Sequence, residues 1–153
     1  MSNYRVIPSD DLKQNRIDSA NAYIQDLNRY AGKIRNEEIR ALLAQTARNI
    51  RDLRDVQYLF DSGEKELVTL YSRYLPYLLT ILEQYVLIEN AGNYNAASKA
   101  SAKLSDTLTL LNRTVREITK LLPEDEIDEA NAQAKAEKIK EMLNAVSRST
   151  GLL

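Results

Sequence analysis

Residues 97–122 read ASKASAKLSDTLTLLNRTVREITKLL, and small or apolar residues recur along them at alternating steps of four and three. The repeat runs through Ala97, Ser101, Leu104, Leu108, Leu111, Val115, Ile118 and Leu122. A mean step of about 3.5 residues is typical of near-parallel helices that pack along a shared seam. This stretch therefore predicts a long helix with one face buried against other helices.

Four further stretches carry the same alternation, and none of their seam positions is charged. They are Ile17, Ala20, Ile24, Leu27, Ala31, Ile34; Ile39, Leu43, Thr46, Ile50, Leu53, Gln57, Phe60; Leu67, Tyr71, Tyr74, Leu78, Ile81, Tyr85, Ile88; and Ala132, Ala136, Ile139, Leu143, Val146. We expect these residues to form the core. The polar half of the last stretch, 124–136, predicts a loosely packed helix or one that needs a partner to cover it.

Glycine and proline are scarce, with four and three copies among 153 residues, against a usual share of roughly 12%. They stand at Pro8, Gly32, Gly63, Pro76, Gly92, Pro123 and Gly151. Without Pro76, their spacing predicts an all-α antiparallel bundle of about five long helices. A flexible arm (1–8) would precede a single domain (9–153). The first junction lies either at Gly32 or near Asn36.

The absence of Cys and His excludes Ser-His-Asp and Cys-His catalysis, and zinc sites that use either residue. We expect no cofactor. With 21 basic and 22 acidic residues the net charge is −1, so no nucleic-acid partner is expected. Because no apolar stretch reaches roughly 18 residues and no signal peptide is visible, we expect a cytoplasmic protein without a transmembrane segment.

Pro76 interrupts the third stretch inside its densest apolar run. A proline there removes the hydrogen bond to the Ser72 carbonyl and costs about 3 kcal/mol in a helix interior. One interpretation is a kink that lets the helix follow its neighbours. Another is a kinked aromatic surface that receives another protein, with Tyr74, Pro76 and Tyr77 as partner-binding residues. A ligand pocket is a third.

The run Tyr74-Leu75-Pro76, followed by Leu79, Leu82, Glu83 and Tyr85, resembles the bacterial "5-bromo-4-chloroindolyl phosphate hydrolysis" (XpaC-type) family of helical proteins. The resemblance extends over residues 20–152, including the closing Gly151-Leu152, although Asp61-Ser62-Gly63 replaces a Pro-rich turn. It implies a context of toxic-anion resistance and envelope stress. It also implies a toxic-anion-resistance type of partner, through which any membrane association would be made.

The family name implies phosphate-ester hydrolysis, but it supplies no catalytic residue to transfer. The nearest candidate metal pair is Glu126-x-x-Glu129, for which the alternative is acidic capping of a helix start. Arg40, Arg48, Arg51 and Arg54 fall within about 120° of a helix face. They form either a phosphate-binding stripe or a solvated, salt-bridged face.

The chain has nine Tyr, and Tyr71, Tyr74 and Tyr85 fall on the seam, where each hydroxyl needs a partner. We expect the partners to be Thr, Ser or Asn residues on neighbouring helices, for example Thr107, Thr114 or Asn112. We expect Tyr77 to be exposed. The leading hypothesis is a non-enzymatic interaction protein, and the alternative is a metal-dependent phosphoesterase. Because the 3.5-residue repeat fits an intermolecular coiled coil equally well, a homo-oligomer stays open.

Overall fold

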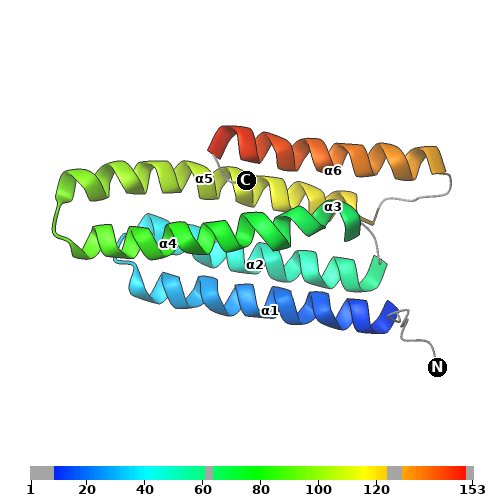
Figure 1. The fold of residues 1–153 in the computed structure, drawn as a ribbon, viewed down its shortest axis with the longest axis horizontal. Helices are drawn as coiled ribbons and strands as arrows, with labels where there is room; N and C mark the ends of the chain where they lie inside the picture. Colours follow the sequence, from blue (N-terminus) through cyan, green and yellow to red (C-terminus); the bar gives the residue numbers. More distant parts are fainter. Residues whose placement is uncertain (1–8, 61–63, 124–128, 151–153) are drawn as a thin grey trace, which may run out of the picture.

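The computed structural model describes residues 9–60, 64–123 and 129–150, and the side chains of 17–59, 67–123 and 133–150. The elements are α1 (Ser9–Lys33), α2 (Glu37–Phe60), α3 (Glu64–Thr69), η1 (Leu70–Tyr74), α4 (Leu75–Asn90), α5 (Tyr94–Leu121) and α6 (Glu129–Thr150). Since α3, η1 and α4 follow one another without a break, they form one rod, and the described chain is a bundle of five rods without strands (Figure 1). The predicted all-α bundle of about five long helices is confirmed.

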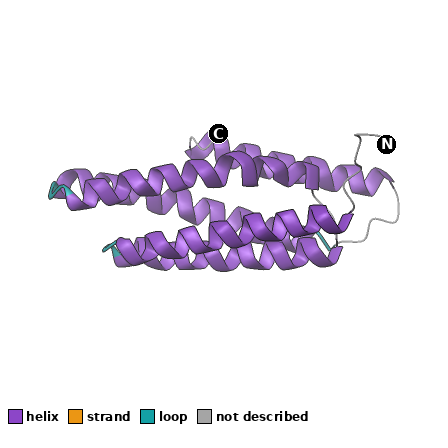
Figure 2. Ribbon diagram, turned by 60° about the horizontal axis from the view of Figure 1, so that its bottom comes forward, coloured by secondary structure: helices purple, strands orange, loops and turns teal. Residues whose placement is uncertain are grey.

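Four rods form a ring. α1 packs against α2, α2 against α5, α5 against α4 and α4 against α1, whereas α6 lies outside this ring on α5 and α3. Figure 1 shows the chain reversing direction from each rod to the next, and Figure 2 shows the described loops at the rod ends. α6 therefore packs on α5 and on the first part of the third rod.

The two described tight junctions have clear local causes. Asn36 caps α2, because its side-chain oxygen accepts from the Ile39 backbone N–H at 3.1 Å. Asn93 caps α5 in the same way through Ala96, at 3.0 Å. Gly92, with φ +77°, supplies the left-handed residue that ends the preceding helix.

The first break thus falls at 34–36, near Asn36, while Gly32 lies inside α1. The arm 1–8 and the junctions at Gly63 and Gly151 lie outside the described residues.

The seams predicted from the sequence form most of the observed core. On α5 and its C-cap residue Leu122, all six seam residues from Leu104 to Leu122 are at most 3% exposed. The third rod buries three residues that the seam omitted, Leu70, Leu75 and Leu82. They are buried because this rod packs against both α1 and α5, so its buried arc is wider than a single seam.

Candidate functional site

The helix widens into a π turn immediately before Pro76. The Leu75 backbone N–H donates to the carbonyl of Leu70, five residues back rather than four. Pro76 then follows with no N–H to donate. The proline is accommodated by one wide turn that shifts the hydrogen-bond register, a device often found at functional positions in helices. The kink itself stays a prediction.

This register shift changes the donor that faces the Tyr71 carbonyl. Its α-helical donor, the Leu75 N–H, is used by Leu70, and the next residue is Pro76. The Tyr23 hydroxyl, from α1, donates to the Tyr71 carbonyl instead, at 2.5 Å. A side chain from another rod therefore completes the π turn.

The same three-helix contact includes a buried glutamine. The Tyr71 hydroxyl donates to the side-chain oxygen of Gln57 on α2, at 3.0 Å, and the Tyr23 and Tyr71 rings lie 6.3 Å apart. Gln57 is 2% exposed, and its Nε2 has no hydrogen-bond partner in the described structure. Burial, and then the charge of Asp26, raises the pKa of Tyr23.

Tyr74 is not on the surface, which corrects its assignment as a partner-binding residue. It is 2% exposed, and its hydroxyl donates to the Leu143 carbonyl on α6 at 2.9 Å. α6 covers this side chain, so Tyr74 binds the fifth rod rather than a second protein.

Tyr77, in contrast, is 44% exposed, as expected. It lies between two surface depressions. One, of about 450 Å³, is lined by Arg73, Pro76, Tyr77 and Thr80. The other is a groove of about 360 Å³ between α4 and α5. Pro76 and Tyr77 are therefore both part of a hollowed surface.

The α4–α5 groove begins where α6 ends. Thr150, the last residue of α6, lines it together with Tyr77. The rest of its lining is mainly apolar on α4 and evenly apolar and polar on α5: Ile81, Gln84, Tyr85, Ile88, Ala100, Lys103, Leu104 and Thr107. The groove therefore adjoins the end of α6, and none of the described helices lies over it.

The expected examples of tyrosine partners were wrong, although the expected residue types occur beside one tyrosine. Tyr71, Tyr74 and Tyr85 donate to the Gln57 side chain, the Leu143 carbonyl and the Glu89 carboxylate. Tyr85 also lies within hydrogen-bonding reach of the Asn36 and Ser101 side chains. Asn112 instead pairs with another buried asparagine, Asn49 on α2: Asn49 Nδ2 lies 3.2 Å from Asn112 Oδ1. The sequence identified the polar core residues but not their pairing, which depends on the angular positions of separate helices.

The arginine stripe lies on α2, and two of its four members are engaged by neighbours. Arg54 Nη1 donates to Asn21 at 2.6 Å and Nη2 pairs with Asp55 at 2.9 Å. Arg51 Nε lies 3.8 Å from Asp52. Arg40 and Arg48 are exposed. This arrangement agrees better with a salt-bridged face than with a continuous cationic surface, and phosphate binding there stays a prediction.

Glu126 lies outside the described residues, and Glu129 starts α6 without a described side chain. Among the residues that the structure describes, no three carboxylates are grouped so that they could hold a metal ion. Within the same part of the chain, each helix is too short or too polar to cross a membrane.

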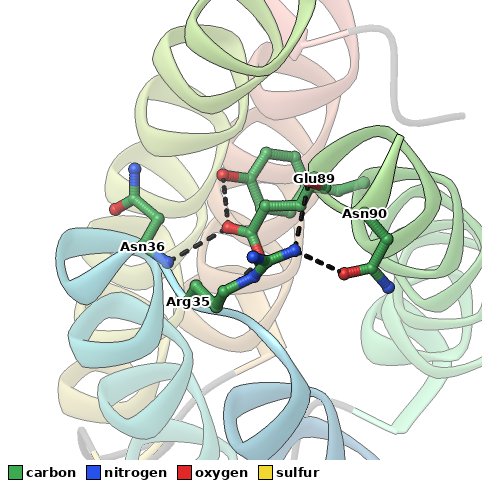
Figure 3. Close-up of polar contacts among 5 residues, drawn as sticks. Arg35, Asn36, Glu89 and Asn90 are labelled. Carbon is green, nitrogen blue, oxygen red and sulfur yellow. Dashed lines mark hydrogen bonds and ion pairs between the residues drawn. The ribbon is translucent and has the colours of Figure 1, made fainter. Parts of the chain in front are cut away.

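A largely buried carboxylate that the sequence did not point to holds the other end of the bundle together (Figure 3). Glu89, on α4, accepts from the backbone N–H groups of Arg35 and Asn36 at 2.8 and 3.1 Å. The Tyr85 hydroxyl also donates to it, at 3.1 Å. The Arg35 guanidinium donates to the Asn90 side chain at 2.8 Å. Glu89 therefore fixes the α1–α2 loop to the end of α4.

This cluster changes the chemistry of one tyrosine. Burial, followed by the charge of Glu89, raises the pKa of Tyr85 to about 12. The hydroxyl stays protonated and serves as a hydrogen-bond donor. The cluster is consequently a structural clasp, in which the Glu89 carboxylate accepts from two backbone N–H groups and one hydroxyl.

Comparisons with protein-family models, with curated proteins and with solved structures found no match to this chain.

Proposed function

We propose that this chain is a non-enzymatic helical-bundle protein that acts by binding another protein through the surface around Pro76 and Tyr77. The observation that carries the proposal is the exposed Tyr77 ring between two depressions, on a helix widened by a π turn. Exposed aromatic residues beside hollowed, partly apolar surface are typical of protein–protein contact sites.

The resemblance of Tyr74-Leu75-Pro76 and the residues after it to the XpaC-type family supports a more specific proposal. We place the protein in that family, in the cytoplasm, with a partner of the toxic-anion-resistance type and any membrane association made through that partner. Within this motif Tyr74 has a packing role, because its hydroxyl donates to the Leu143 carbonyl of α6.

The test is capture of partners from the native host by tagged wild-type protein and by Tyr77→Ala. We expect the variant to lose at least about fivefold of the specifically captured protein, a loss of about 1 kcal/mol. Its melting temperature should not change, because the ring is exposed. Tyr94→Ala is the matched control, since Tyr94 is 83% exposed and lines neither depression.

Recovery of the same proteins by wild type and Tyr77→Ala would show that this surface assignment is wrong. The enzymatic alternative is tested on the purified chain with Mg²⁺ or Mn²⁺ and a chromogenic phosphate ester. Turnover that Glu126→Ala and Glu129→Ala abolish would replace the proposal with a phosphoesterase.

A further inference from the structure

The groove between α4 and α5 continues the seat of a helix, and this continuity indicates what fits it. α6 lies on α5 and α3, with Leu143 bonded to Tyr74, and it ends at Thr150 in the mouth of the groove. Beyond Thr150 the third rod and α5 continue, and none of the described helices covers them there (Figure 1). From this geometry we infer that the groove binds an amphipathic helix of another protein, end to end with α6, with acidic residues flanking its apolar face. This inference rests on the proposed function.

The walls have the periodicity of a helix-binding surface. On α4 the lining residues follow steps of four, three and four, through Tyr77, Ile81, Gln84 and Ile88. From Tyr77 to Ile88 the wall is about 16 Å long at 1.5 Å per residue. That length accommodates about three helical turns, so an occupant needs three or four apolar residues at i, i+3 or i+4 and i+7.

The charge of the lining sets the character of the occupant. Its charged members are Lys103 in the groove and Arg73 in the adjoining depression, and the described residues of the two linings include no carboxylate. Glu83 and Asp106 are exposed on the same helices but outside both linings. A helix with Asp or Glu beside its apolar face complements these two cations, and one with Lys or Arg there is repelled.

The same charges disfavour a second copy of this chain as the occupant. Two copies related by a two-fold axis through the groove would place Lys103 and Arg73 of both chains in one interface. Like charges brought together in this way oppose association. A different protein with an acidic amphipathic helix therefore fits the groove better than self-pairing does.

The test uses the full chain and two synthetic helical peptides of about twelve residues. The peptides share one apolar face and differ only in their flanking residues, Glu in one and Lys in the other. Titration by fluorescence anisotropy at low salt should show the acidic peptide binding at least about tenfold more tightly. Lys103→Glu should remove or invert this preference. Tyr77→Ala should lower the affinity for the acidic peptide by at least about fivefold.

Equal affinities for the two peptides, no effect of Lys103→Glu, or binding weaker than about 1 mM for both would overturn the inference. Peptide-independent self-association, seen by light scattering and removed by Ile88→Asp, would also overturn it, in favour of a second copy. Lys99→Glu is the control, because Lys99 is exposed on α5 outside the lining. If the peptide titration fails but capture of a partner still depends on Tyr77, the inference of an acidic helix as the occupant is rejected and the proposed function stands.

Discussion

Single polar side chains connect rods that are otherwise held by apolar seams. Glu89 is the clearest case, since its carboxylate accepts from two backbone N–H groups 53 and 54 residues away in the chain. A glutamate at the end of a helix is usually a solvated residue. Here its side chain is 10% exposed, because the α1–α2 loop folds over it. Charge-assisted hydrogen bonds of this kind are stronger than neutral ones.

The raised pKa of Tyr85 predicts how stability depends on pH. In the unfolded chain a tyrosine ionises near pH 10, whereas Tyr85 in the folded chain does so near pH 12. The folded state holds the proton more tightly, so this contribution is complete below pH 10 and is lost as pH rises toward 12. Between about pH 10 and 12, we expect the ionisation of Tyr85 to lower the free energy of unfolding by about 1.4 kcal/mol per pH unit.

Urea titrations at about pH 9.5, 10.5 and 11.5 measure the slope. Tyr85→Phe, which cannot ionise, should be less stable at neutral pH but should show a flatter decline between about pH 10 and 12. The same slope in wild type and Tyr85→Phe would contradict the assignment. Tyr94→Phe is the control, since its ring is exposed and should leave the slope unchanged.

At the scale of the element, the third rod combines a proline with a π turn. In the wide turn, the Leu75 N–H donates to the Leu70 carbonyl instead of the Tyr71 carbonyl. The next residue, Pro76, has no N–H that could donate to the Tyr71 carbonyl. The Tyr23 hydroxyl on α1 compensates for that loss. A buried carbonyl without a donor costs about 1–3 kcal/mol, which explains why an apparently remote tyrosine supports a helix that contains Pro76.

This arrangement predicts an energetic coupling between Tyr23 and Pro76. Tyr23→Phe in the wild-type background should lower the free energy of unfolding by about 1–2 kcal/mol, because the Tyr71 carbonyl loses its donor. In a Pro76→Ala background the same change should cost about half as much or less, because the alanine introduced there has an N–H that can serve this carbonyl. A double-mutant cycle by urea unfolding measures the difference.

Additive effects in that cycle would show that the Tyr23 hydroxyl does not replace the backbone N–H that Pro76 lacks. Tyr30→Phe on the same helix is a matched control, since Tyr30 is also largely buried at 8% exposure. Its effect should be the same in both backgrounds.

At the scale of the whole molecule, the described rods have a preferred register. Asn49 of α2 and Asn112 of α5 pair inside the bundle, and Asn112 Nδ2 also donates to the Leu42 carbonyl at 3.3 Å. Both side chains are at most 6% exposed. A buried amide pair can be satisfied only when the two helices stand at one axial offset, so such pairs specify alignment in helix bundles.

The pair predicts a non-additive pair of substitutions. Asn112→Leu alone should destabilise the protein by about 1–3 kcal/mol, because the buried Asn49 amide loses the shorter of its two hydrogen bonds and keeps only the 3.5 Å contact to the backbone carbonyl of residue 112. The double variant Asn49→Leu, Asn112→Leu should recover most of that loss, since two apolar residues replace two polar ones. Urea unfolding measures the energies. A double variant as unstable as the sum of the single variants would contradict this role.

Light scattering on the same double variant tests register. If the asparagines specify the alignment of α2 and α5, their joint removal should broaden the distribution of species or raise the mass relative to wild type. An unchanged mass and a sharp, cooperative transition would show that the apolar seams alone define the alignment.

The sequence by itself determined the helices, their approximate ends and most of the core. A 3.5-residue apolar repeat and the scarcity of glycine and proline are local properties, and they describe a helix and its buried face without reference to other segments. The seam on α5 was buried as predicted from Leu104 to Leu122, and the exposure of Tyr77 followed from its position off the seam.

Tertiary structure alone decided which polar groups meet. The hydrogen bond from Tyr74 to the Leu143 carbonyl, the clasp on Glu89 and the Tyr23 contact to the π turn each join residues at least 48 positions apart. Periodicity gives the angle of a residue on its own helix but not the axial offset or rotation of one helix against another. The groove also depends on tertiary structure, because residues of α4, of α5 and the last residue of α6 line it together.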